Sequence, residues 1–228
     1  MRARRRLSLG VKRVIDVIGA GVGLIALSPV LAGIALVLLL TQGRPIFFRQ
    51  RRPGLHGRLF TIVKFRTMRS SRPGEAWYAT DPQRVTRIGR MLRSTSLDEL
   101  PELWNVLRGE MSLVGPRPLL AEFLPNYTPQ EARRHEMRPG VTGWAVVNGR
   151  QAAAFEERFR LDVWYVDNWS LGLDARIIGR TIAQVLRRTD ASEAQGMSDI
   201  DLPARLEAGL GTLDDPPVRP GNGSSDPH

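Results

Sequence analysis

A run of 24 uncharged residues near the start of the chain, from Val17 to Leu40, constrains the fold more than any other feature of the sequence. The hydrocarbon core of a bilayer is about 30 Å thick and needs about 20 helical residues, so the run is long enough for a membrane segment. Ser28 and Pro29 lie at its middle. Proline lacks an N–H group and clashes with the carbonyl four residues earlier, so we expect the helix to break there. The Ser28 hydroxyl could then bond to a carbonyl that the break leaves free.

The two halves of the run and its flanks favour a re-entrant hairpin. Each half, Val17–Leu27 and Val30–Leu40, has 11 residues and would reach only about 16 Å as a helix. Basic residues precede the run and follow it, and Lys and Arg prefer the cytoplasmic side of a membrane. A hairpin keeps both flanks on that side. The alternative is a kinked helix that spans the membrane, which would place the two flanks on opposite sides. A cleaved signal peptide fits poorly, because the run is too long and no A-x-A site follows it.

The charge of the chain is large and uneven. Its 228 residues carry a formal charge of +10, yet residues 1–74 hold 15 Lys or Arg and a single acid, Asp16. Such a balance indicates a polyanionic partner: nucleic acid, an anionic membrane surface or phosphate-rich substrates. There is no cysteine, which excludes disulfide scaffolds, cysteine-based zinc sites and thiol catalysis.

Composition divides the chain into three segments. Residues 1–43 form the basic N-terminus and the membrane helix, residues 44–188 a compact domain, and residues 189–228 an acidic tail that we expect to be disordered. Periodicity and turn residues predict a strand over 59–68, loop and strand over 138–150, and helices over 84–93, 129–137, 155–166 and 175–187. The prediction is therefore an α+β fold, mostly helical with short strands.

One further helix is the clearest of all. Leu100, Leu103, Trp104 and Leu107 recur at helical spacing, and Gly109 is a good C-terminal stop. We place its start at or beside Asp98, because Pro101 then falls in the first turn, where its missing N–H matters little. Ser96 as N-cap, with a capping-box spacing to Glu99, is the alternative.

The adjacent carboxylates Asp98 and Glu99 are the candidate catalytic pair. A helix N-terminus stabilises the ionised form of a carboxylate, an aspartate can attack phosphorus, and a neighbouring glutamate can hold Mg²⁺. The competing interpretation is a helix cap with a solvated neighbour.

The candidate phosphate ligands are arginines, whose guanidinium matches a phosphate with two parallel hydrogen bonds. They are Arg93, Arg117, Arg138 and Arg150, and each could equally be a surface side chain. Only Arg117 has a preset direction, because prolines restrict the backbone on both sides. The chain has no standard P-loop or dinucleotide-binding motif, and its three histidines have no metal-ligand spacing.

Several ordered blocks of sequence together resemble the bacterial sugar transferases, the monotopic phosphoglycosyl transferases that begin glycoconjugate assembly. The blocks are KRVIDVI (12–18), LSPV (27–30), QRRPG (50–54), KFRTM (64–68), RSTSLDELPELWNVLRGEMSLVGPRP (93–118), RPGVTGWAVVNGR (138–150) and LDVWYVDNWS (161–170). The resemblance implies a monotopic membrane protein, with a re-entrant helix broken at Ser28-Pro29 and a cytoplasmic catalytic domain over residues 44–188.

The resemblance also implies a reaction. A sugar 1-phosphate would pass from a UDP-sugar to polyprenyl (undecaprenyl) phosphate with release of UMP, through a covalent intermediate on Asp98. Asp98 and Glu99 would hold Mg²⁺. The candidate ligands for the substrate phosphates are Lys64, Arg93, Arg117, Arg138 and Arg150.

The location and partners follow from the same resemblance. The expected place is the cytoplasmic face of the bacterial inner membrane, against anionic lipid headgroups, with no nucleic acid and with a dimer as one candidate assembly. The alternative hypothesis is a non-enzymatic basic adaptor at the membrane surface that binds anionic lipid or nucleic acid, motivated by the charge of residues 1–74.

Overall fold

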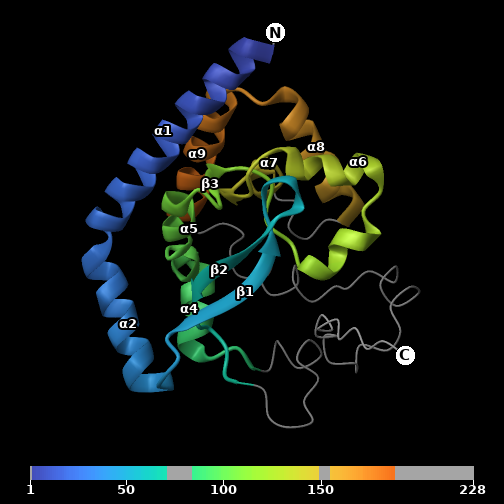
Figure 1. Cartoon of the computed structure of the whole chain (residues 1–228). Coiled ribbons are helices and arrows are strands. Elements are labelled where there is room, and N and C mark those ends of the chain that lie inside the picture. The colour runs from blue at the N-terminus through green and yellow to red at the C-terminus, as the bar shows by residue number, and fades with distance from the viewer. Residues whose placement is uncertain (1, 71–83, 149–154, 188–228) are drawn as a thin grey trace, which may run out of the picture.

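The computed structural model describes residues 2–70, 84–148 and 155–187, and confirms an α+β fold that is mostly helical with short strands (Figure 1). The N-terminal half contains α1 (Arg2–Ala26), α2 (Ser28–Gln42), β1 (Phe47–Pro53), η1 (Leu55–Gly57), β2 (Leu59–Phe65), α4 (Arg87–Ser94), η2 (Leu97–Glu99) and α5 (Glu102–Arg108). The C-terminal half contains β3 (Ser112–Val114), η3 (Ala121–Asn126), α6 (Pro129–Ala132), η4 (Arg133–Glu136), β4 (Gly140–Thr142), α7 (Trp144–Val147), α8 (Phe155–Asn168) and α9 (Leu171–Arg187).

The apolar run breaks where the sequence predicts. α1 ends at Ala26 and α2 begins at Ser28, with Pro29 in its first turn. The Ser28 hydroxyl donates to the carbonyl of Ile25 at 2.8 Å, as expected for a broken helix. Within the described residues no single helix is both long and apolar enough to cross a bilayer, but Leu7–Ala26 and Ser28–Gln42 together meet that test as a pair bent by 60°.

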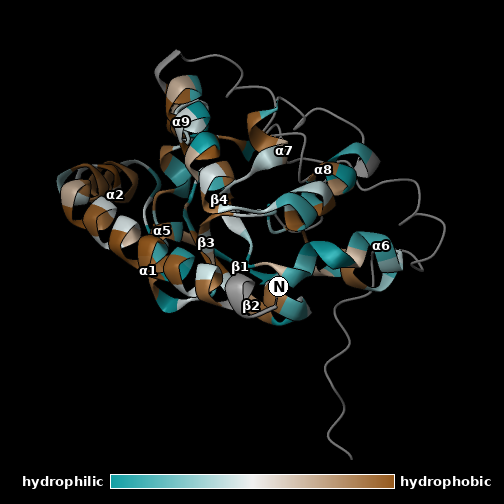
Figure 2. Ribbon diagram, turned by 90° about the horizontal axis from the view of Figure 1, so that it is seen from above, coloured by the Kyte–Doolittle hydropathy of each residue, from teal (hydrophilic) through white to brown (hydrophobic). Residues whose placement is uncertain are grey.

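The two helices of the bent pair are unequal in length, whereas the sequence predicts two halves of 11 residues. The difference arises because α1 extends far beyond the N-terminal end of the apolar run. It begins at Arg2, and the helical face that carries Lys12, Asp16 and Ala20 is buried against the domain. Figure 1 shows α1 and α2 as an arc along one side of the molecule. In Figure 2, α2 is hydrophobic almost throughout, whereas α1 mixes both kinds of residue. α1 is therefore also a docking helix.

The buried face of α1 is joined to the domain by charged groups. The Lys12 ammonium donates to Asp174 in α9 at 2.6 Å, and the Asp16 carboxylate accepts from the Ser112 hydroxyl and the Leu113 amide, both at 3.0 Å. Arg13 donates to two carbonyls at the C-terminal end of α5. These contacts fix α1 against both α5 and β3.

Two small sheets frame the domain. β1 and β2 pair as an antiparallel hairpin, from Phe47 opposite Phe65 to Pro53 opposite Leu59, so the strand predicted over 59–68 is confirmed with its end at Phe65. β3 and β4 pair in parallel. Gly140 is required there, because a Cβ on it would lie 2.1 Å from the Gly115 amide nitrogen. The second sheet therefore places residue 115 and the arginine segment after it.

The start of α5 corrects the sequence prediction. The helix begins at Glu102 with Pro101 as N-cap, while Asp98 lies in the preceding 3-10 turn and Ser96 adopts a left-handed φ of 55°. Pro101 has no N–H to donate to the Leu97 carbonyl, so a regular α-helical ladder cannot run through it from Asp98. The predicted stop at Gly109 is confirmed, with φ at 82°.

The remaining helices agree with prediction to within a few residues. The helix predicted over 84–93 is α4, that over 129–137 is α6 followed by η4, and the last two are α8 and α9. Residues 138–150 hold β4 and also the short helix α7, where loop and strand were predicted. The predicted tail, residues 189–228, lies outside the described residues.

Candidate active site

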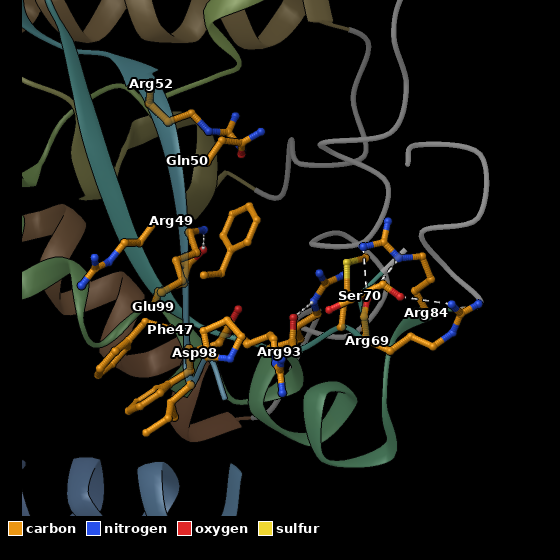
Figure 3. Close-up of a pocket in the computed structure, with 18 of the residues that line it drawn as sticks. Phe47, Arg49, Gln50, Arg52, Arg69, Ser70, Arg84, Arg93, Asp98 and Glu99 are labelled. Carbon is orange, nitrogen blue, oxygen red and sulfur yellow. Dashed lines mark hydrogen bonds and ion pairs between the residues drawn. The ribbon is translucent and has the colours of Figure 1, made fainter. Parts of the chain in front are cut away.

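A cavity of about 760 Å³ opens between the β1–β2 hairpin, α4 and η2 (Figure 3). Asp98 and Glu99 lie in its wall with eleven other polar or charged residues, and the rest of the lining includes three phenylalanines. The lining comprises Pro45–Gln50, Arg52, Lys64–Ser70, Arg84, Arg93, Asp98, Glu99, Arg117 and Leu120. Eight of these side chains are basic and two are acidic, so the cavity suits a ligand with several negative charges.

Asp98 is buried but incompletely bonded. The residue is only 6% exposed, and its Oδ1 has no hydrogen-bond partner among the described residues. Burial and the adjacent Glu99 raise the pKa of Asp98 to about 6, although Lys64, Arg93 and Arg117 oppose the rise. A buried carboxylate oxygen without a partner is costly and calls for a functional explanation.

Glu99 has the opposite environment. Lys64 Nζ donates to its Oε1 at 2.8 Å, Arg117 Nη2 donates to the same oxygen, and Arg117 Nη1 lies 3.4 Å from Oε2. Burial alone would raise the pKa of Glu99, but the charges of Arg117 and Lys64 outweigh it and hold the pKa well below its usual range. Glu99 is therefore the ionised member that orders the two cations.

A third carboxylate, Glu102, lies behind Lys64 and was not singled out in the sequence. Its Oε1 is 3.2 Å from Lys64 Nζ, and burial above all raises its pKa to about 7. Lys64 thus bridges β2 to both η2 and α5. The sequence shows an acidic residue at position 102, but it does not show that Lys64 of β2 lies next to it in the fold.

The predicted phosphate ligands separate into two groups. Lys64, Arg93 and Arg117 all line the cavity, and Arg93 Nε also donates to Thr67 Oγ1 at 3.0 Å. Arg138 is not in the lining; its Nε donates to the Gly109 carbonyl at 2.9 Å, beside α5. Arg150 lies outside the described residues.

Sequence reasoning missed most of the basic lining. The additional side chains come from β1, from the loop after β2 and from residue 84: Arg49, Arg52, Arg66, Arg69 and Arg84. The excess of basic residues before residue 74 was the available signal. It did not show which of them face one cavity, because that depends on the register of the hairpin.

The two carboxylates fit a magnesium ion held jointly with a substrate. The described residues contain no cluster of three metal-ligating side chains. Mg²⁺ is commonly bound by one or two carboxylates together with phosphate oxygens. Among the residues that the structure describes, Asp98 Oδ1 has no hydrogen-bond partner and Glu99 Oε2 has a long contact of 3.4 Å to Arg117, so both oxygens retain capacity to bind a cation.

Comparison with known proteins gives the class. The family model described as bacterial sugar transferase matches residues 7–188, so the chain belongs to that family and is a transferase. This confirms the resemblance and argues against the non-enzymatic adaptor.

Similar proteins include a sugar transferase and two transferases whose names give undecaprenyl phosphate as a substrate. The chain is 51% identical over 175 residues, 77% of its length and 87% of the relative's, to a protein of Bacillus subtilis named uncharacterized sugar transferase EpsL. It is 42% identical over 190 residues, 79% of its length and 71% of the relative's, to the UDP-glucose:undecaprenyl-phosphate glucose-1-phosphate transferase of Caulobacter vibrioides. It covers only 43% of the undecaprenyl-phosphate galactose phosphotransferase of Salmonella typhimurium, at 38% identity over 205 residues and 82% of the chain.

We predict that Asp98 titrates near pH 6 in the protein without substrate or metal, because burial disfavours its charged form. The measurement is a carbon NMR titration of labelled aspartate in detergent, assigned with Asp98→Asn. Lys64→Met should move the midpoint to higher pH, since it removes a charge that favours the carboxylate, and Arg138→Met, outside the cavity, should leave it in place. A midpoint near 4, or one insensitive to Lys64, contradicts the described environment.

Proposed function

We propose that the chain transfers a sugar 1-phosphate from a UDP-sugar to polyprenyl phosphate, releasing UMP and forming a polyprenyl diphosphate-sugar. This would be the first membrane step in assembling a glycoconjugate such as an O-antigen, capsule, exopolysaccharide or glycoprotein glycan. The observation that carries the proposal is the buried Asp98 carboxylate, with one oxygen unpartnered, in the wall of a strongly basic cavity. The names of the relatives, which include transferases of glucose 1-phosphate to undecaprenyl phosphate, support the choice of substrates.

The first half of the reaction uses Asp98 as nucleophile. Its Oδ1 attacks the β-phosphorus of the donor, the bond from that phosphorus to the bridging oxygen breaks, and UMP leaves with the electron pair. The product is a phosphosugar esterified to Asp98. An oxygen of polyprenyl phosphate then attacks the same phosphorus, and the bond to Asp98 breaks to restore the carboxylate.

The basic side chains around Asp98 hold and orient the phosphates. Arg117 and Arg93 present guanidinium groups to the cavity, and Lys64 adds an ammonium. Both Arg117 and Lys64 donate to Glu99 Oε1, which holds the two cationic groups close together. They therefore need not move when the substrate binds. When bound through Asp98 and Glu99, Mg²⁺ would offset the repulsion between the carboxylate and the diphosphate.

The cavity has two ends of different character, which supports two kinds of ligand. Figure 3 shows Asp98 between Phe47 and the group formed by Arg69, Ser70 and Arg84. Phe47 stacks on Phe65 with ring centroids 5.4 Å apart, and Phe65 packs in one cluster with Leu38 of α2. The aromatic end therefore adjoins the apolar helix and suits an isoprenoid chain, while the arginine end suits a nucleotide.

We further propose that α1 and α2 form a re-entrant membrane element at the cytoplasmic face of the inner membrane. The 60° bend at Leu27 and the basic residues on both flanks support this topology. Large apolar side chains remain exposed along α1 and α2, and Met91 and Trp104 add to the exposed apolar surface of α4 and α5. Anionic headgroups would meet the basic flanks.

Asp98→Asn should abolish donor-dependent UMP release, because an amide oxygen is a much weaker nucleophile than a carboxylate. The assay is liberated UMP from a panel of UDP-sugars with undecaprenyl phosphate and Mg²⁺, with near-equal circular dichroism and melting temperature for both proteins. Arg138→Met, whose side chain contacts Gly109 away from the cavity, is the matched control and should retain turnover. Turnover by Asp98→Asn at the wild-type rate would refute the nucleophile.

The topology is tested by introducing a single cysteine at Ser8 or at Arg44, one on each side of the bent pair, into a chain that has none of its own. In intact inverted membrane vesicles, whose cytoplasmic face is outward, an impermeant maleimide should label both positions, because a re-entrant pair returns to the same side. Labelling of only one position until the vesicles are permeabilised would show a spanning helix instead.

A further inference from the structure

A buried arginine, Arg134, contacts the backbone of Arg117. Arg134 is 2% exposed and belongs to η4. Its Nη2 donates at 2.6 Å to the Asp162 carboxylate in α8 and, also at 2.6 Å, to the backbone carbonyl of Arg117. Nη1 donates to the Tyr127 hydroxyl at 3.0 Å. One side chain thus joins η4, α8 and the segment that carries Arg117.

A contribution to stability does not by itself explain the buried ion pair between Arg134 and Asp162. The Arg134 guanidinium lies 5.8 and 5.4 Å from the rings of Tyr127 and Phe159, and its Nε has no hydrogen-bond partner among the described residues. Burying two charges is expensive, and apolar residues of similar volume often serve as well or better in such places. An apolar side chain in place of Arg134 could make none of its hydrogen bonds, and the one that reaches the candidate active site is the bond to the Arg117 carbonyl.

Two consecutive carbonyls of the backbone around Arg117 accept hydrogen bonds from other elements. Pro116 and Pro118 have no N–H to donate. The Pro116 carbonyl accepts from the Gly140 amide at 3.0 Å, which ties it to β4. The next carbonyl, that of Arg117, is the one bound by Arg134. The two donors, from β4 and η4, therefore hold consecutive peptide groups.

We infer that Arg134 and Asp162 form a positioning pair that aims Arg117 at Glu99 and at the substrate phosphate. Asp162 fixes the guanidinium, the guanidinium fixes the carbonyl of Arg117, and the side chain on the same residue then reaches Glu99. The expected effect of this pair on the catalytic rate rests on the proposed function. Its expected effect on the position of the Arg117 side chain does not depend on which reaction the protein performs.

The test of turnover is a double-mutant cycle on Arg134→Met and Arg117→Met. A displacement of about 1 Å can cost about 100-fold in rate, so we expect Arg134→Met to lower kcat/KM for the UDP-sugar by about 10- to 100-fold. In the Arg117→Met background the same change should cost little more, because there is no guanidinium left to aim. The melting temperature should fall equally in both backgrounds. Losses that multiply in the cycle would show a merely structural role and overturn the inference.

A second variant and a control keep the test decisive. Arg134→Lys keeps a positive charge beside Asp162 and should fold even if Arg134→Met does not, yet its shorter side chain should still lower kcat/KM and should lose that effect in the Arg117→Met background. Arg133→Met removes the neighbouring arginine, which is paired with Asp167 at the surface, and should leave turnover unchanged. A full-activity Arg134→Lys protein with Arg117 displaced would overturn the inference.

A readout independent of turnover separates this inference from the proposed function. In nitrogen NMR of arginine side chains, assigned with Arg117→Met, the Arg117 signal should shift in Arg134→Lys and stay in place in Arg133→Met. An unshifted Arg117 signal contradicts the positioning role whatever reaction the protein performs. A shifted signal in Arg134→Lys, together with no UMP release by the unsubstituted protein, would sustain the positioning role and sink the proposed function.

Discussion

The arrangement of the site depends on the ion pairs that Glu99 makes with Arg117 and Lys64. These pairs use one of two adjacent carboxylates to collect positive charge, and so leave the other, Asp98, buried beside that charge with an oxygen free to react. Neither carboxylate could do this alone. Without Glu99 the two cations would turn to Asp98 and lower its reactivity, and without them a buried Asp98 would hold a proton more firmly.

The same constraint links the site to the bent helix pair. Arg13 of α1 bonds to the end of α5, the helix that follows the carboxylates, and Asp16 bonds to β3, the strand that precedes the segment of Arg117. α5 and β3, the two elements between the carboxylate pair and the segment of Arg117, are thus attached to one docking helix, which continues into the apolar element. This attachment fixes the site relative to that element, as the proposed reaction between a soluble donor and a lipid phosphate would require.

Local chemistry was enough to predict several features from the sequence. The break at Ser28-Pro29 and the stop at Gly109 follow from what proline and glycine do to a helix in any context. The start of α5 was misplaced because the effect of Pro101 on the turn before it was underestimated.

Features that depend on distant partners could not be predicted in the same way. Glu102 and Arg134 read as ordinary polar positions in two helical stretches, and their burial arises only when β2 and α8 pack against them. Arg138 was also a candidate phosphate ligand, yet its side chain bonds to the Gly109 carbonyl outside the cavity. The resemblance to the family placed Asp98, Glu99 and Arg117 in one site, and the structure shows that Arg117 pairs with Glu99.

The central claim is that one oxygen of Asp98 becomes esterified to phosphorus. It is tested most directly by incubating the protein with Mg²⁺ and its UDP-sugar in the absence of any lipid acceptor, then measuring the intact mass and mapping the modified peptide. The account predicts one added phosphosugar per chain, located on Asp98 and removed when polyprenyl phosphate is supplied. An unmodified protein that nevertheless completes turnover when the acceptor is added would contradict it.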